Sequence, residues 1–136
     1  MHHEEGRNPK EVGRLVARRC DVTDEVAVST LFDTVQAQFG PLDVLVNSAG
    51  VASQSSCVDL SLAEWDRVLG TNLTGTFLCN QAALRQMLPA KRGSIVNVAS
   101  QASKRGLPLL THYCASKAGV PRFCARALLK SHLMSE

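Results

Sequence analysis

The chain has 136 residues, of which 45% are hydrophobic, 20% charged and 4% aromatic, and its formal net charge is +3. This length and composition predict one globular domain. The charge is too small for the clustered basic face of nucleic-acid-binding proteins, and the scarcity of aromatic residues argues against a base-stacking surface. No apolar run approaches the roughly 20 residues that cross a bilayer, so we expect no membrane span.

The five cysteines are odd in number and include no C-x-x-C pair. This pattern argues against both a disulfide framework and a zinc site, and it favours a reducing compartment. The first residues are polar rather than apolar, which argues against a secretory signal. We therefore expect a cytoplasmic protein without a metal site.

The first half of the chain alternates between strand and helix patterns. Residues 15–20 form a short mixed run that we interpret as a strand, and residues 21–24 supply N-cap side chains for a helix. Apolar residues then recur at helical spacing until Gly40-Pro41 ends the helix. The apolar run at 42–46 predicts a strand that is covered on both faces, as in a parallel sheet.

The second half continues the alternation. Ser61 begins a capping box, and a long helix is expected over 62–88 until Pro89 ends it. Residues 94–100 predict another strand, and a last helix begins near Tyr113 and runs towards His132. This order predicts an α/β fold with a parallel sheet, in which a ligand binds at the edge where the strands end.

One residue conflicts with the last helix. Pro121 lies four residues after Lys117, so it removes the N–H that would bond to the Lys117 carbonyl. A proline inside a helix costs about 3 kcal/mol. We therefore predict a kink or a break near residues 117–121.

The strongest candidate for chemistry is the pair Tyr113-x-x-x-Lys117. Positions i and i+4 lie on the same face of a helix. A free tyrosine is a poor base at neutral pH, but a nearby cation favours the phenolate. The pair is therefore suited to exchanging a proton with an alcohol or a carbonyl. An exposed helix face without function is the alternative interpretation of this pair alone.

Three further motifs occur in order before this pair. The segment Asn47 to Gly50 follows the apolar strand, Asn72 and Gly75 form N-x-x-G within the long helix, and Ser100 ends the next predicted strand. With Y-x-x-x-K, this series resembles the short-chain dehydrogenase/reductase family over roughly residues 6 to 130. The resemblance implies a partial Rossmann-like, doubly wound parallel sheet and an NAD(P)-dependent oxidoreductase.

The resemblance implies a role for each catalytic residue. Tyr113 would be the general acid/base, and Ser100 would hydrogen-bond to the substrate oxygen. Lys117 would favour the phenolate and bind the nicotinamide ribose. Asn72 would hold a water molecule that extends the proton relay, although a bend in the helix beside Gly75 is a compatible structural role.

The resemblance also implies which residues bind the cofactor. Asp21 and Val22 match the pair that borders the adenine, and capping of the next helix is the alternative for them. Asn47, Ala49 and Gly50 would line the adenosine side, although Gly50 would equally serve a turn.

The choice of cofactor and substrate is less closely specified. Arg7 matches a position where an arginine often meets the 2′-phosphate of NADP, so it favours NADP over NAD, with an ordinary charged terminal residue as the alternative. The residues around Ser100 and Tyr113 look like those of sugar-alcohol dehydrogenases and also fit 3-oxoacyl reductases. We expect a small alcohol or carbonyl substrate and no nucleic-acid or membrane partner.

The sequence departs from the family pattern at the glycine-rich turn T-G-x-x-x-G-x-G, which no segment matches. That turn presents backbone N–H groups to the pyrophosphate, so we expect weak cofactor affinity. We interpret residues 1–136 as one incomplete dinucleotide-binding domain that lacks the first strand–helix unit and the C-terminal strands. The alternative function is a truncated, non-catalytic fragment. In either case, self-association is expected through the helices at 62–88 and 113–130.

Overall fold

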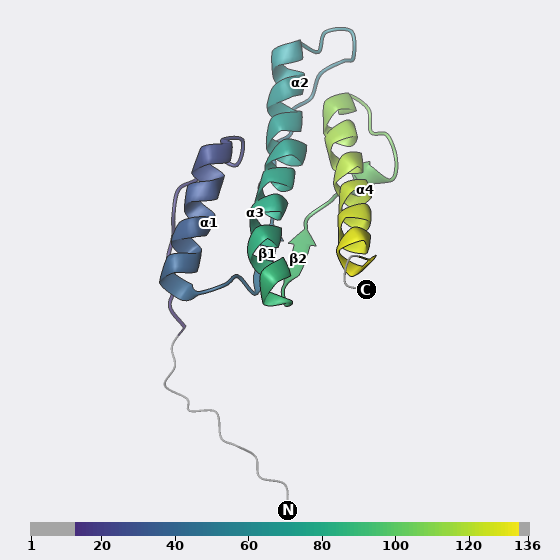
Figure 1. Ribbon diagram of the computed structural model, residues 1–136. Helices are drawn as coiled ribbons and strands as arrows, with labels where there is room; N and C mark the ends of the chain where they lie inside the picture. The colour runs from purple at the N-terminus through teal and green to yellow at the C-terminus, as the bar shows by residue number, and fades with distance from the viewer. Residues whose placement is uncertain (1–12, 134–136) are drawn as a thin grey trace, which may run out of the picture.

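The computed structural model describes the backbone of residues 13–133 and the side chains of residues 13–122. In Figure 1, α1, the column formed by α2 and α3, and α4 stand side by side, with β2 visible between the lower parts of α3 and α4. The elements in chain order are α1 (Glu25–Phe39), β1 (Val44–Asn47), α2 (Leu62–Leu69), the π-helix η1 (Gly70–Thr74), α3 (Gly75–Ala90), β2 (Ser94–Asn97), the 3-10 helix η2 (Gln101–Ser103) and α4 (Thr111–Leu133).

Strands β1 and β2 pair in parallel, with Val44 opposite Ser94 and Asn47 opposite Asn97. This pairing confirms that the runs at 42–46 and 94–100 are neighbouring parallel strands, although each observed strand has only four residues. Because the strands are parallel, both end at the same edge of the sheet, and the loops after β1 and β2 lie close together.

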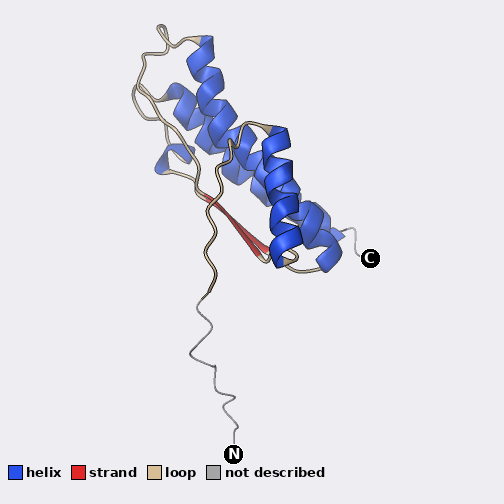
Figure 2. Cartoon of the chain, turned by 90° about the vertical axis from the view of Figure 1, so that its left-hand side faces the viewer, coloured by secondary structure: helices blue, strands red, loops and turns tan. Residues whose placement is uncertain are grey.

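Only one face of this sheet is covered. Leu45 and Ile95 pack against the core between α1 and α3. Val44, Val46 and Val96 point to the other face and are 54%, 59% and 51% exposed. Figure 2 shows the helices gathered on one side of the two strands. The prediction that the first strand is covered on both faces is therefore wrong, because the described helices all pack on the same face.

The core is a cluster of side chains from two helices. Val28 and Phe32 of α1 pack against α3. The strands add the partly buried side chains of Leu45 and Ile95 to the same cluster. The α3 members of the cluster are Cys79, Ala82, Ala83 and Met87. Burial of these apolar groups is what holds the strand ends in place beneath the helices.

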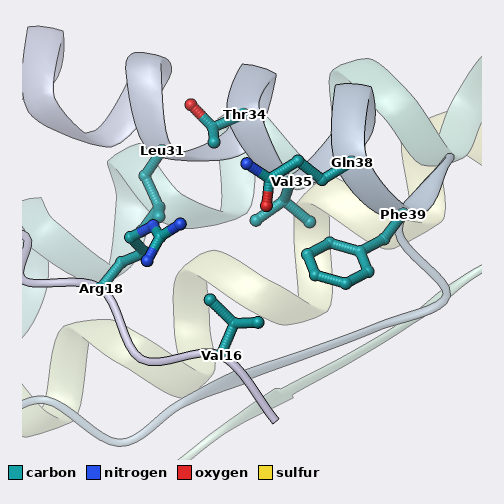
Figure 3. Close-up of a pocket in the computed structure, with 7 residues that line it drawn as sticks. All are labelled: Val16, Arg18, Leu31, Thr34, Val35, Gln38 and Phe39. Atoms are coloured by element: carbon teal, nitrogen blue, oxygen red, sulfur yellow. The ribbon is translucent and has the colours of Figure 1, made fainter. Parts of the chain in front are cut away.

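The predicted strand at 15–20 is wrong: this segment has no regular secondary structure. It crosses beside α1, where Val16 and Arg18 face the helix over a cavity of about 210 Å³ (Figure 3). Leu15 is 95% exposed. A strand needs a neighbour for its backbone hydrogen bonds, and β1 and β2 are the only paired strands within residues 13–133.

The helix boundaries follow local capping signals. The Asp24 carboxylate accepts hydrogen bonds from the N–H groups of Val26 and Ala27 at the start of α1. Ser61 accepts from the Glu64 N–H at the start of α2. The Glu64 carboxylate does not complete a capping box, because it bonds to Arg67 and Ser53 instead.

The long helix expected over 62–88 is interrupted and longer than predicted. The π-helix η1 separates α2 from α3, and α3 continues through Pro89 to Ala90. Lys91, in the left-handed conformation, ends the helix and donates its N–H to Leu88. Proline near the end of a helix removes a single N–H, so one further residue is tolerated.

Helix α4 runs without a break from Thr111 to Leu133, and Pro121 lies inside it. The predicted break is therefore wrong. The turn before Pro121 is anchored by buried side chains, including Ser116, Lys117 and Val120, so the loss of one hydrogen bond is offset by packing. No helix within the described part of the chain is long and apolar enough to span a membrane.

Candidate active site

The candidate site lies where β1 and β2 end and the first turns of α4 begin. Lys117 is 6% exposed, and its Nζ donates a hydrogen bond to the Val98 carbonyl at 3.0 Å, just after β2. Tyr113 lies one helical turn earlier and is half-buried. The helix period therefore places the phenol and the ammonium on one face of α4, beside the end of the sheet.

Asn72 lies in the π-helix η1 and is completely buried. Its Nδ2 donates to the Val51 carbonyl and to Ser116 Oγ, both at 2.9 Å, and its Oδ1 accepts from the Val51 N–H at 2.8 Å. The amide thus joins the loop after β1 to α4. A π-helix, a feature frequent at functional sites, lies where a bend beside Gly75 was the alternative role of Asn72. For a relay water, the side chain retains only the second lone pair of Oδ1.

Gly50 brings the preceding loop close to both of these residues. A Cβ placed at Gly50 would lie 3.4 Å from Asn72 Oδ1 and 3.4 Å from Lys117 Nζ. The structure therefore brings Gly50, Asn72 and Lys117 together, whereas the resemblance implied that Gly50 would line the adenosine side and Lys117 would bind the nicotinamide ribose. The absence of a side chain at Gly50 allows the loop to approach the buried ammonium closely.

Ser100 lies on the loop after β2, at the N-cap of η2. Its Oγ accepts a hydrogen bond from the Ala102 N–H at 3.2 Å, and its proton remains available for donation. Helix η2 packs against α4. Within the described part of the chain, no hydrogen bond joins the hydroxyls of Ser100 and Tyr113, so the structure places Ser100 on the neighbouring loop without bonding it to Tyr113.

Asp21 and Val22 lie on the turn before α1. The Asp21 carboxylate accepts from the Thr23 N–H at 2.9 Å and from Thr23 Oγ1 at 2.8 Å, and these bonds lower its pKa. Asp24, rather than Asp21, is the N-cap of α1. Val22 packs against Gly75, where a Cβ would lie 2.7 Å from Val22 Cγ2.

Three of the predicted cofactor residues line one apolar cavity of about 290 Å³ between α1 and β1: Val22, Asn47 and Ala49. The Asn47 amide has a structural role as well, because its Nδ2 donates to Asn80 Oδ1 and to Asn97 Oδ1, both at 2.7 Å. Arg7 lies outside the described residues.

The motif analysis missed a second polar cluster beside Tyr113. Ser53 Oγ contacts Glu64 Oε1 and lies 2.8 Å from His112 Nε2, and His112 is fully buried. Arg67 binds the Glu64 carboxylate through two hydrogen bonds of 2.8 Å. The available signal was weak: His112 precedes Tyr113 and lies four residues before Ser116, so it shares a face with another buried polar residue.

The Glu64 carboxylate is strongly stabilised in its charged form. The hydrogen bonds from Arg67, and then that from Ser53, lower its pKa from 4.5 to about 2. A carboxylate whose pKa falls on folding adds stability above its unfolded value, and that stability is lost as the pH falls towards the folded value. Glu64 therefore stabilises the fold at neutral pH and ceases to do so between about pH 4.5 and pH 2.

We expect the melting temperature of Glu64→Gln to fall less steeply than that of the parent chain between pH 4.5 and pH 2. Thermal unfolding followed by the fluorescence of Trp65, the single tryptophan, measures this difference. Asp66→Asn removes an exposed carboxylate from the same helix and serves as the control. Equal acid sensitivity of the parent and Glu64→Gln would contradict the assignment.

Comparison with known proteins shows the family and the fold. A sequence model of the family described as short chain dehydrogenase matches residues 3–132. The chain is 52% identical over 101 residues to D-threitol dehydrogenase of Mycolicibacterium smegmatis. It is 43% identical over 100 residues to inactive 2-(S)-hydroxypropyl-CoM dehydrogenase 2 of Xanthobacter autotrophicus. Each match covers 74% of this chain, and 39% and 44% of the respective relatives.

A solved structure extends the likeness to the backbone. The structure, described as a short-chain alcohol dehydrogenase from Sinorhizobium meliloti, matches with a TM-score of 0.74 and 41% identity. The match covers 77% of this chain and 42% of that chain. The predicted α/β, partial Rossmann-like fold is thereby confirmed. The chain spans about two fifths of the length of these relatives.

Proposed function

The chain belongs to the short-chain dehydrogenase/reductase family, and from that premise we propose that it carries the proton-transfer site of an NAD(P)-dependent oxidoreductase acting on a secondary alcohol or ketone. One observation carries the proposal: Lys117 is buried one turn from Tyr113 and beside Gly50 and Asn72, at the end of the sheet. Within the described residues this ammonium has no carboxylate partner, and burying a charge without one is costly, so its place here supports a functional role.

The proton chemistry follows from these positions. Tyr113, with the Lys117 ammonium on the same face of α4, would take a proton from an alcohol or return it to a carbonyl oxygen. The Ser100 hydroxyl donates a hydrogen bond to that same oxygen and stabilises the negative charge that develops there. Asn72 holds the loop after β1 against α4, and this fixes the positions of Lys117 and Gly50 relative to each other. NAD(P), when bound, supplies or takes up the hydride.

The residues fit parts of this cofactor. Lys117 Nζ suits a ribose hydroxyl, because an ammonium donates up to three hydrogen bonds and, within the described residues, it forms one, to the Val98 carbonyl. The cavity bordered by Val22 and Ala49 suits the adenosine side. No segment of the given sequence matches the glycine-rich turn for the pyrophosphate, so residues 1–136 act as an incomplete dinucleotide-binding domain of low affinity.

The proposed substrate is a polyol or a similar small secondary alcohol. The support is the 52% identity over 101 residues to a D-threitol dehydrogenase. The choice between NAD and NADP is left to measurement, with Arg7 favouring NADP.

Titration of the purified chain with NADH and with NADPH, followed by nicotinamide fluorescence, tests the proposal. We expect saturable binding with a Kd below about 1 mM, and slow polyol oxidation with the matching oxidised cofactor. Tyr113→Phe should bind the cofactor equally well and lower kcat by about 10²–10⁴-fold. Absence of binding of either cofactor up to about 1 mM would overturn the proposal.

A second candidate is a non-catalytic chain that acts by self-association. Apolar residues are exposed on two surfaces: Leu62 and Leu88 of α2 and α3 are 73% and 53% exposed, and the valines of the sheet face are about half exposed. Exposed apolar patches of this kind mark interaction sites. A relative that is described as inactive shows that this sequence type occurs without activity. Sedimentation of the titrated sample separates the candidates: a stable oligomer that binds neither cofactor supports this one.

A further inference from the structure

Two stripes of polar side chains run along the first turns of α4. Tyr113 and Lys117 form the stripe at the candidate site. His112 and Ser116 form the adjacent stripe, and both are fully buried. Residues four apart on a helix share a face, so the second stripe sets how the helix is rotated about its axis.

Each residue of the buried stripe is bonded to another part of the fold. Ser116 Oγ accepts from Asn72 Nδ2 at 2.9 Å and donates to the Tyr113 carbonyl at 2.8 Å. His112 Nε2 lies 2.8 Å from Ser53 Oγ on the loop after β1, and Ser53 contacts Glu64 of α2. The first turn of α4 is therefore tied to both η1 and α2.

The direction of the hydrogen bonds in the second tie follows from the charge on Glu64. Two bonds from Arg67 keep the carboxylate ionised, so it can only accept. The single proton of Ser53 is therefore donated to Glu64, and Ser53 Oγ must accept from His112 Nε2–H. In the neutral imidazole, Nδ1 is then unprotonated, and this buried atom has no hydrogen-bond partner in the described part of the chain.

We propose that His112 is a positioning residue for Tyr113: its Nε2–H bond to Ser53, backed by Glu64, holds the first turn of α4 and so fixes where the phenol lies. The effect of His112 on turnover rests on the proposed function, whereas its effect on the position of α4 does not. A buried donor without its acceptor is unfavourable, so removal of the tie favours a rotation or a shift of α4. A 1 Å displacement of a catalytic group lowers turnover about 10²-fold.

Tyr113 is the only tyrosine of the chain, so ring-labelled tyrosine reports on it directly by NMR. Three variants separate the tie from simple packing. His112→Gln keeps an N–H donor for Ser53, His112→Leu removes it, and Ser53→Ala removes the acceptor. We expect the ring signals of His112→Gln to match the parent, and those of His112→Leu and Ser53→Ala to shift or broaden.

Val120→Ala is the matched control. Val120 is buried on the same helix with 2% exposure and has no polar side chain, so its truncation lowers stability and should leave the Tyr113 signals in place. Equal changes in Val120→Ala and His112→Leu would overturn the proposal, as would an unchanged spectrum in both His112→Leu and Ser53→Ala. If His112→Leu fails to fold, the spectrum of Ser53→Ala alone tests the proposal. Ser53 is half-buried on a loop, so we expect this variant to fold.

The nitrogen spectrum of His112 provides a second readout. We expect Nδ1 to be unprotonated and Nε2 to carry the proton, with the signals assigned by their loss in His112→Gln. The opposite tautomer, with the proton on Nδ1, would contradict the proposed hydrogen bond from His112 Nε2–H to Ser53. Where turnover is measurable, His112→Leu should lower kcat about 10²-fold with little change in KM, and His112→Gln should restore most of it. The NMR readouts need no cofactor, so they test His112 even in a chain that binds neither NADH nor NADPH.

Discussion

Asn72→Leu is expected to lower the free energy of unfolding by about 3 kcal/mol, the largest effect we predict for a single side chain. The substitution keeps the branched shape of the side chain and removes every polar atom of a completely buried amide. It leaves the N–H and carbonyl of Val51 and the hydroxyl of Ser116 without their partner. Each unsatisfied buried group costs about 1–3 kcal/mol, with water entry limiting the sum.

Urea unfolding followed by Trp65 fluorescence measures this loss as a lower midpoint at an unchanged slope. Thr71→Val is the matched control, since Thr71 lies beside Asn72 in η1 and its hydroxyl bonds only to the Arg67 carbonyl within the same helical segment. That bond is local, so its loss should cost less than about 1 kcal/mol. Similar midpoints for the two variants would show that Asn72 does not join the loop to α4 in solution.

Gly75→Ala is expected to destabilise the chain by about 1–3 kcal/mol, although alanine is the better helix former. A Cβ at this position would lie 2.7 Å from Val22 Cγ2 and 3.1 Å from the Val22 carbonyl oxygen. The backbone oxygen cannot move aside as a side chain can, so the turn containing Asp21 and Val22 must shift. Under the proposed function, the same variant should also bind NADH and NADPH less tightly.

The control for Gly75→Ala is Gly70→Ala, five residues earlier at the start of η1. The nearest atom to a Cβ at Gly70 is Thr23 Cγ2 at 3.9 Å, an ordinary contact, and the backbone of Gly70 is helical. Alanine there should therefore stabilise the chain by up to about 1 kcal/mol. Melting temperatures that move in opposite directions confirm the close approach at Gly75, and a gain in both variants would contradict it.

Several features of the structure could be predicted from the sequence. The spacing of Tyr113 and Lys117 places them on one face of any helix, because an α-helix repeats every 3.6 residues. The capping side chains of Asp24 and Ser61 act within three residues of themselves. The two apolar runs became parallel neighbours because their length and order favour a sheet with crossover helices. The first two depend on contacts between residues that are close in the chain or on a regular period, whereas the strand pairing depends on the order of the elements.

Other features depend on partners far away in the sequence, and only the tertiary structure decided them. Residues 15–20 have the composition of a strand and yet form none, because no described strand offers hydrogen bonds beside them. The π-helix forms where the Asn72 amide reaches Val51, 21 residues away. His112 gains its role from Ser53, 59 residues away. A periodic pattern shows which face of an element is apolar, whereas the atom that satisfies a buried polar group is chosen by the packing of the whole chain.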